Sequence, residues 1–263
     1  MKDKDRLDKL LPELSLIDTR SKAQALIMAG NVRVNGQVIT KSGTLVPRDS
    51  VITVEGVKQW AGRGAQKLLR AFEVFPLDVE GKICADFGAS TGGFTDVLLA
   101  NGAQKVYAVD VGYGQLIWRL ASDPRVVVMD RTNARYLTRS DFPERIEFAS
   151  CDVSFISLRL ILPVLDDAVR DDAVVLIKPQ FEAGRERISK GVVRDKAVHA
   201  EVIESTAEFI HEHTSFRIAG LTYSPIRGPE GNIEFLCYLT HKEVDENYNV
   251  DDIVNEAHEF LGR

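Results

Sequence analysis

The sequence of 263 residues predicts an α/β protein with a mostly parallel sheet, preceded by a small α+β module. Four apolar runs, 83–86, 106–110, 126–130 and 146–152, each end in an aspartate. These aspartates follow one another at intervals of 20 to 24 residues, about the length of one strand–helix–strand unit. Strands repeated at this interval form a parallel sheet, so all four aspartates are expected at its carboxyl edge, where open α/β sheets bind ligands.

Four carboxylates at one edge restrict the ligand. Asp86, Asp110, Asp130 and Asp152 repel phosphates, so the expected ligand offers hydroxyls, amines or a positive charge. S-adenosylmethionine (SAM), with a sulfonium, an ammonium, a ribose and an adenine amino group, fits this requirement better than a dinucleotide does. NAD stays an alternative, because an acid about 20 residues beyond a glycine-rich turn also suits that cofactor. A common role of aspartate as a turn residue explains one or two of the four.

Composition indicates an ordinary globular protein. The apolar fraction is 44% and the net charge is −6, so any contact with nucleic acid must come from a local basic patch. Cys84, Cys151 and Cys237 lie in apolar runs, and their odd number indicates reduced, buried thiols without a disulfide or a metal site. The charged first residues differ from a signal peptide, and no apolar stretch approaches membrane-spanning length. We therefore expect a cytoplasmic protein.

The amino-terminal part of the chain has its own pattern. Leucines within 7–11 predict a short helix, and Asp18 or Thr19 can cap a second helix. Asn35–Gly36 separates two short apolar runs and predicts a hairpin, since this dipeptide favours the tight turns of hairpins. A third strand is expected at 51–54.

The order of these features resembles the S4 RNA-binding domain. The resemblance lies in Arg6–Asp8, Thr19–Ile27 and Gly30–Gly36, and covers nearly all of residues 1–56. It implies contact with structured ribosomal RNA (rRNA), although scattered basic residues are more commonly a solvated surface. The expected RNA-binding residues are Arg6, Arg20, Ser21, Lys22, Arg33, Lys41 and Arg63.

A short glycine-containing connection at 57–63 is expected to link the S4 module to a second domain at 64–240. An acidic tail at 241–263 has an apolar stripe and is expected to form a surface helix. Three further strands, at 173–178, 216–223 and 233–240, bring the sheet to seven. Helices are expected near 64–72, 93–101, 114–121, 157–169 and 195–213.

A glycine-rich turn follows the first strand of the second domain. Its glycines allow close approach of a ligand, and a helix beginning near Gly93 directs free N–H groups at a carboxylate. The turn lacks the Gly-Lys-Ser/Thr of a P-loop and departs from G-x-G-x-x-G. With Asp110 placed for ribose hydroxyls and Asp130 for the adenine amino group, it predicts a SAM site. The expected cofactor-binding residues are Asp86, Gly88, Ser90, Thr91, Gly92, Phe94, Asp110, Asp130 and Asp152.

Polar residues in apolar settings point to chemistry. Lys178 ends a buried strand before Pro179, and a lysine is rarely buried unless it is paired. Glu234 lies in an apolar run, where a position on the other face of the sheet is an equally good explanation. Lys67 lies on the helix that opens the domain, where a solvated lysine is the ordinary interpretation.

Together, Lys67, Asp152, Lys178 and Glu234 resemble the Lys-Asp-Lys-Glu set of the FtsJ-like ribose 2′-O-methyltransferases. The motifs around them resemble the TlyA family, which pairs an S4 domain with this fold. They are residues 63–68, 86–95, 151–158, 178–182 and 232–235. The resemblance covers the chain to about residue 240. It implies a Rossmann-like SAM-dependent methyltransferase fold. It also implies an enzyme that methylates cytidine 2′-hydroxyls in the rRNA of a ribosomal subunit.

Such an enzyme must hold the ribose oxygen in line with the methyl group and assist departure of the proton. We expect Lys178 to be the general base, with Lys67, Asp152 and Glu234 completing the catalytic set. Which lysine is neutral stays open. Some members of the family are labelled haemolysins, so a membrane-active protein is one alternative. A non-catalytic RNA-binding factor and a small-molecule methyltransferase are the others, and the latter leaves the S4 module without a role.

Overall fold

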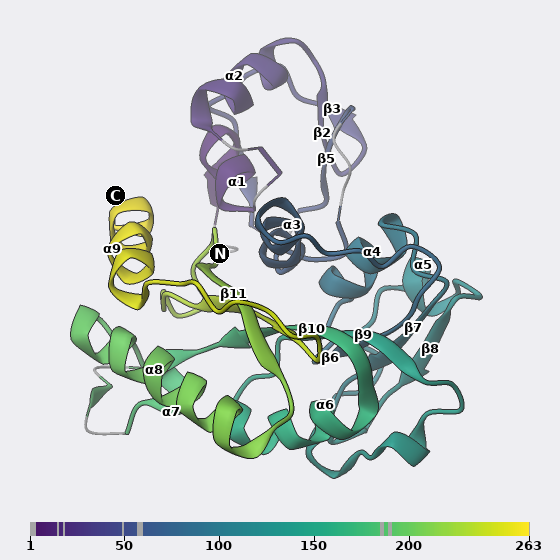
Figure 1. The fold of residues 1–263 in the computed structure, drawn as a ribbon. Helices are drawn as coiled ribbons and strands as arrows, with labels where there is room; N and C mark the ends of the chain where they lie inside the picture. The colour runs from purple at the N-terminus through teal and green to yellow at the C-terminus, as the bar shows by residue number, and fades with distance from the viewer. Residues whose placement is uncertain are drawn as a thin grey trace. The chain divides into compact units, whose positions relative to one another are not determined.

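The computed structural model describes residues 4–14, 16–17, 19–48, 50–56, 60–184, 187–188 and 191–262. The chain divides into two compact units, Met1–Arg63 and Gly64–Arg263 (Figure 1). Asp18, one of the two expected helix caps, and residues 57–59 of the expected linker lie outside the described residues. The sequence-based limits of the linker and of the tail stay predictions.

The amino-terminal unit packs two helices beside short strands. Thr19 caps the second helix by accepting a hydrogen bond from the backbone N–H of Lys22 at 3.3 Å. Asn35 and Gly36 have φ of +49° and +83°, as the expected hairpin requires. The pairing of β1 with β4 was not foreseen, because three-residue strands leave no alternation to read. The elements are β1 (Lys4–Arg6), α1 (Leu7–Glu13), α2 (Arg20–Met28), β2 (Val32–Val34), β3 (Gln37–Val38), β4 (Leu45–Pro47) and β5 (Ile52–Val54).

The second unit is built on one seven-stranded sheet in the order β11-β12-β10-β9-β6-β7-β8. β12 runs antiparallel to both neighbours, and the other contacts in the sheet are parallel. The predicted mostly parallel sheet is therefore confirmed. The chain order reverses between β6 and β9, which is where open α/β sheets bind ligands. The strands are β6 (Ile83–Phe87), β7 (Lys105–Val109), β8 (Val126–Met129), β9 (Ile146–Cys151), β10 (Val169–Ile177), β11 (Arg217–Tyr223) and β12 (Phe235–Thr240).

Helices cover both faces of this sheet. In Figure 1, α3 and α4 lie on one side and α6 and α8 on the other. The acidic tail forms a helix, α9, which packs on α8 and β11 through a buried stripe that includes Val254 and Ala257. The helices are α3 (Ala65–Val74), α4 (Gly93–Ala100), α5 (Trp118–Ala121), α6 (Leu162–Ala168), α7 (Pro179–Glu182), α8 (Lys196–His213) and α9 (Val250–Leu261).

Two expected helices are shorter than the sequence predicted. The first, at 114–121, is reduced to α5, because carboxylates at the strand ends bind the backbone of the preceding loop. The second, at 157–169, is divided into a 3₁₀ turn at Leu158–Leu160 and α6. Pro163 lies in the first turn of α6 and has no N–H to continue a helix from the preceding residues.

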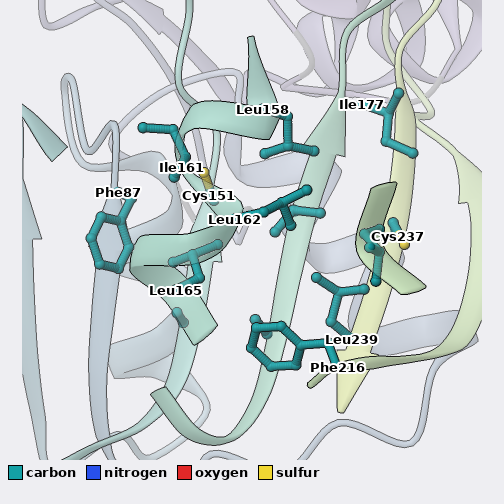
Figure 2. Packing of buried hydrophobic residues seen from close by; sticks show 14 of the residues in the cluster. Phe87, Cys151, Leu158, Ile161, Leu162, Leu165, Ile177, Phe216, Cys237 and Leu239 are labelled. Carbon is teal, nitrogen blue, oxygen red and sulfur yellow. The ribbon is translucent and has the colours of Figure 1, made fainter. Parts of the chain in front are cut away.

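The main apolar core lies between the sheet and the helices α6, α8 and α9. Figure 2 shows Leu162 and Leu165 of α6 among strand residues such as Phe87 and Leu239. The three cysteines are buried and unpaired, as expected. Burial raises the pKa of the Cys84 and Cys151 thiols to about 12, so these sulfurs stay protonated and serve as apolar packing.

Candidate active site

A cavity of about 800 Å³ lies at the carboxyl edge of the sheet in the second unit. Its walls come from the turns after β6 and β7, from residues 132–135 and from residues 152–157. The volume suits a ligand of nucleoside size with additional groups. Gly88, Ser90, Asp110 and Asp152 are the expected cofactor-binding residues that line it.

The turn after β6 needs glycine for a steric reason. Gly88 has φ of +85°, and a β-carbon there would lie 2.9 Å from the carbonyl oxygen of Asp152. Only glycine allows the β6 and β9 turns to approach this closely. Ser90, two residues later, also has a left-handed backbone, with φ of +48°. Its backbone N–H donates to Asp110 at 2.8 Å, which stabilises that conformation.

Asp110 follows β7 and lines the cavity with a fixed carboxylate. Each of its oxygens accepts one backbone N–H, from Ser90 at 2.8 Å and from Gly112 at 2.7 Å. A carboxylate oxygen has more than one acceptor position, so both oxygens can still accept hydrogen bonds from a ligand hydroxyl. Asp110 is therefore a pre-oriented acceptor at the cavity wall.

Asp86 does not line the cavity, which corrects the expectation that it contacts the cofactor. It is fully buried and accepts hydrogen bonds from the N–H and hydroxyl of Thr95 and from the hydroxyl of Ser150. Burial raises the pKa of Asp86 to about 7, against the opposing effect of these hydrogen bonds. Asp86 ties β6 to the first turn of α4 and to β9, beneath the glycine-rich turn.

Asp130 is not among the residues that line the cavity, and its contact with a cofactor stays a prediction. It accepts the backbone N–H of Gly114 at 2.9 Å and so holds the loop between β7 and α5. The cavity wall on this side is formed by the following residues, Thr132 to Arg135, instead. Thr91, Gly92 and Phe94 likewise do not line the cavity. For these residues, contact with a cofactor stays a prediction.

The structure brings together the four polar residues expected to carry chemistry. Asp152 contacts Lys178 at 2.6 Å and Lys67 at 3.0 Å, and Lys67 contacts Glu234 at 2.7 Å. The two lysines are each 5% exposed and Glu234 is 1% exposed, whereas the Asp152 side chain reaches the cavity. Lys67 comes from α3, and the other three residues flank the carboxyl or amino ends of β9, β10 and β12. The result is a continuous chain of alternating charges, hereafter the tetrad.

The tetrad fixes the charge of Lys67. Burial alone disfavours an ammonium, but the carboxylates of Asp152 and Glu234 outweigh burial, so the pKa of Lys67 is raised. Lys67 is therefore the permanent cation of the set. Glu234 is further held by the side-chain amide of Gln180, which donates at 3.2 Å.

Lys178 has three acceptors in this structure. Besides the Asp152 carboxylate, its amine donates to the Ser154 hydroxyl at 2.9 Å and to the Asp152 carbonyl at 3.3 Å. Ser154 was not among the sequence candidates, although it lies in the same motif as Asp152. Ser154 lines the cavity, so its contact with Lys178 links that buried amine to a residue of the cavity wall.

Comparison with known proteins decides the family. Residues 60–241 match the model of the FtsJ-like methyltransferases, and residues 5–52 match that of the S4 domain. YqxC of Bacillus subtilis, a candidate rRNA methyltransferase, is 48% identical over 98% of this chain and 95% of its own length. The 16S/23S rRNA (cytidine-2′-O)-methyltransferase TlyA of Mycobacterium tuberculosis is 44% identical over 89% of each chain. The chain belongs to the TlyA family of FtsJ-like methyltransferases.

The family assignment extends to a solved structure. A candidate hemolysin from Streptococcus thermophilus is 43% identical, with a TM-score of 0.78 over 100% of this chain and 98% of that one. The resemblances that the sequence motifs suggested are thus confirmed. In the part of the chain that the structure describes, every helix is too short or too polar to cross a membrane.

The TlyA-family cavity has an exposed aromatic side chain at its wall. Phe155 is 89% exposed and has φ of +64°, an unfavourable backbone for a residue with a β-carbon. Its ring lies 5.3 Å from that of Phe181 on α7. The sequence reasoning missed Phe155, although an aromatic residue between polar neighbours in the Asp152 motif was a usable signal.

In the S4 unit of this TlyA-family chain, a buried carboxylate orders two of the expected RNA-binding arginines. Asp8 is fully buried and accepts hydrogen bonds from Arg6 at 2.9 Å, Arg20 at 3.0 Å and Gln24 at 2.8 Å. These bonds, led by those from Arg6, hold the pKa of Asp8 well below its usual range. The Arg6 and Arg20 side chains stay 42% and 49% exposed, so each can contact a further anion.

The remaining RNA-binding candidates lie on the surface. Arg33 donates weakly, at 3.5 Å, to the carbonyl of Gly36 at the hairpin turn. The others are exposed on α2, on the segment between β3 and β4 and at the end of the unit, and they are Ser21, Lys22, Lys41 and Arg63. Nothing in this geometry contradicts their expected role, which stays a prediction.

Proposed function

We propose that this chain transfers the methyl group of SAM to the 2′-hydroxyl of a ribose in rRNA. The observation that carries the proposal is the tetrad, which joins Lys178, Asp152, Lys67 and Glu234 beside the cavity. A relative 44% identical is named for cytidine 2′-O-methylation of 16S and 23S rRNA, so cytidine is the proposed nucleotide.

The cavity wall suits SAM. Asp110 offers carboxylate oxygens to ribose hydroxyls, and its two backbone bonds keep it oriented before a ligand arrives. Gly88 and Ser90 bring the backbone of the β6 turn to the same wall. When bound, SAM supplies an electrophilic methyl group on a positively charged sulfur. A cavity wall with acidic side chains at Asp110 and Asp152 is compatible with that charge.

Lys178 is the proposed proton acceptor for the ribose hydroxyl. Its amine donates to the hydroxyl of Ser154, a residue that lines the cavity, and a ribose oxygen that takes the place of this hydroxyl would meet the amine. Asp152, at 2.6 Å, stabilises the ammonium that forms when the proton arrives. Lys67 and Glu234 keep Asp152 in place, since Lys67 bridges the two carboxylates. The structure also admits a second role, in which Lys178 stays an ammonium and stabilises the developing oxyanion.

Surface chemistry around the cavity suits a nucleic-acid substrate. Arg131 stacks over the ring of Tyr113 with its guanidinium carbon 4.4 Å from the ring centroid, and Phe155 is exposed at the cavity wall. Aromatic and guanidinium planes are the surfaces on which unpaired RNA bases stack. The S4 unit supplies the basic side chains that contact phosphates. The chain thus combines a methyl-transfer site with two surfaces suited to RNA.

Mapping of rRNA methylation in cells tests the proposal. Three strains are compared: one without the gene, one complemented by the wild type and one complemented by Lys178→Ala. We expect a ribose 2′-O-methyl group that only the wild-type strain carries. If the three strains have identical 2′-O-methylation, the proposed function is wrong. If both complemented strains carry the methyl group and the strain without the gene lacks it, the proposed function holds but the proposed role of Lys178 is wrong.

A further inference from the structure

Two loops carry the groups that meet at the tetrad and at the cavity mouth. One follows β9 and contains Asp152, Ser154 and Phe155, and the other follows β10 and contains Lys178 and Phe181. β9 and β10 are adjacent parallel strands, so the loops leave the same edge of the sheet side by side. Their mutual position determines how Ser154 and Phe155 are presented to a substrate beside Lys178.

Glu182, the last residue of α7, connects these loops. One of its carboxylate oxygens accepts the backbone N–H of Leu158 at 2.6 Å, and the other accepts the Ser157 hydroxyl at 2.7 Å. Both bonds are short and charge-assisted, and Glu182 is half-buried, so water competes with them only weakly. The carboxylate contacts no tetrad residue, so any effect on the reaction must be transmitted by the loop it holds.

The loop that Glu182 holds needs such a constraint. Phe155 adopts a left-handed backbone that few side chains tolerate, and almost its whole surface is exposed. The Phe155 ring lies 5.3 Å from the ring of Phe181, which belongs to the same short helix as Glu182. The hydroxyl of Ser154, one residue before Phe155, accepts a hydrogen bond from the Lys178 amine.

We propose that Glu182 is a positioning residue for methyl transfer. Its two hydrogen bonds hold residues 153–157 against α7, which keeps Ser154 at Lys178 and Phe155 at the cavity wall. This inference rests on the proposed function of the site. It differs from an ordinary helix-capping role, because it predicts an effect on the transfer step that exceeds the effect on folding or on cofactor affinity.

The test compares Glu182→Ala with Glu182→Gln in the full chain. Glutamine keeps an oxygen for the Leu158 N–H and can donate its amide N–H to the Ser157 hydroxyl, whereas alanine removes both bonds. We expect Glu182→Ala to lower the single-turnover rate at saturating SAM and rRNA by about 10–100-fold, the effect of a displacement near 1 Å. Glu182→Gln should recover most of that rate. The exposed Glu204 on α8, changed to alanine, is the matched control and should transfer at the wild-type rate.

A second readout separates this inference from the proposed function. Hydrogen exchange at the Leu158 amide should be faster in Glu182→Ala than in the wild type, and this measurement requires no activity. Wild-type protein that transfers no methyl to rRNA would overturn the proposed function alone. A Glu182→Ala protein with the full transfer rate would overturn the positioning role. So would equal losses of rate in the alanine and glutamine variants, or a loss accounted for by reduced folding or weaker SAM binding.

Discussion

Replacing Lys67 by methionine tests the charge balance of the tetrad. Lys67 contacts two carboxylates, but they depend on it unequally. Without Lys67, Asp152 retains Lys178 at 2.6 Å, whereas among the described residues Glu234 retains only the Gln180 amide at 3.2 Å. The Glu234 side chain is 1% exposed, so the variant leaves a buried carboxylate without its cation. Removing one partner of a buried ion pair costs about 3–5 kcal/mol, so we expect Lys67→Met to lose stability of this order.

A second substitution makes the test specific. In the double variant Lys67→Met with Glu234→Gln, the unpaired charge is gone and the side-chain shape is conserved. Shape matters here, because a β-carbon on Gly228 would already lie 2.5 Å from Glu234. The double variant should recover at least about 2 kcal/mol of the loss, a coupling typical of residues in direct contact. Methyl transfer should not recover, because Asp152 still lacks its second cation.

Urea denaturation of the single and double variants at pH 7 supplies the free energies of unfolding. If Lys67→Met costs less than about 1 kcal/mol, water or another group already compensates Glu234, as it does for surface ion pairs. If the two substitutions are additive, Lys67 and Glu234 do not act as a pair. Either result would refute the reasoning from burial and geometry.

Three further predictions concern the cofactor, the S4 unit and RNA. Asp110→Ala should weaken SAM binding by about 10–100-fold, since a charged hydrogen bond contributes about 1.5–3 kcal/mol; unchanged affinity in calorimetry with RNA present excludes Asp110. Asp8→Asn should destabilise the S4 unit at pH 7. Folding lowers the pKa of Asp8, so its contribution to the free energy of unfolding is complete above the unfolded pKa near 3.9 and is lost as the pH falls further. The difference in stability between Asp8→Asn and the wild type, measured by urea denaturation, should therefore shrink at pH 3. Lys22→Glu should weaken rRNA binding and flatten its salt dependence, whereas Arg20→Glu would also disturb Asp8; equal salt slopes for Lys22→Glu and wild type contradict the RNA-facing role.

Local patterns in the sequence predicted much of the fold. Apolar runs ending in aspartate predicted the strands β6 to β9, because an apolar run bounded by a polar residue is visible over four to six residues. Asn35–Gly36 gave the hairpin for the same reason, since turn chemistry is local. Lys67, Asp152, Lys178 and Glu234 were selected by resemblance to a family, and their distances required the sheet order.

Features that depend on contacts between strands could not be predicted. The side-chain direction of Asp86 is set by Thr95 and Ser150, which lie 9 and 64 residues away. Asp130 binds Gly114 for a comparable reason, since the loop after β7 crosses the end of β8. Ser154 was missed because its contact with Lys178 spans two strands. Periodicity carries no information about such pairs.

Single-turnover methyl transfer tests the central claim most directly. Wild type, Lys178→Ala and Lys178→Arg are mixed with labelled SAM and rRNA, and nuclease digestion then locates the label. We predict label on a ribose 2′-oxygen, and a rate about 10²–10⁴-fold lower for Lys178→Ala. Lys178→Arg should be no better, because guanidinium does not accept a proton. Label on a base, or a Lys178→Arg protein as fast as the wild type, would contradict proton removal by Lys178 at a ribose hydroxyl.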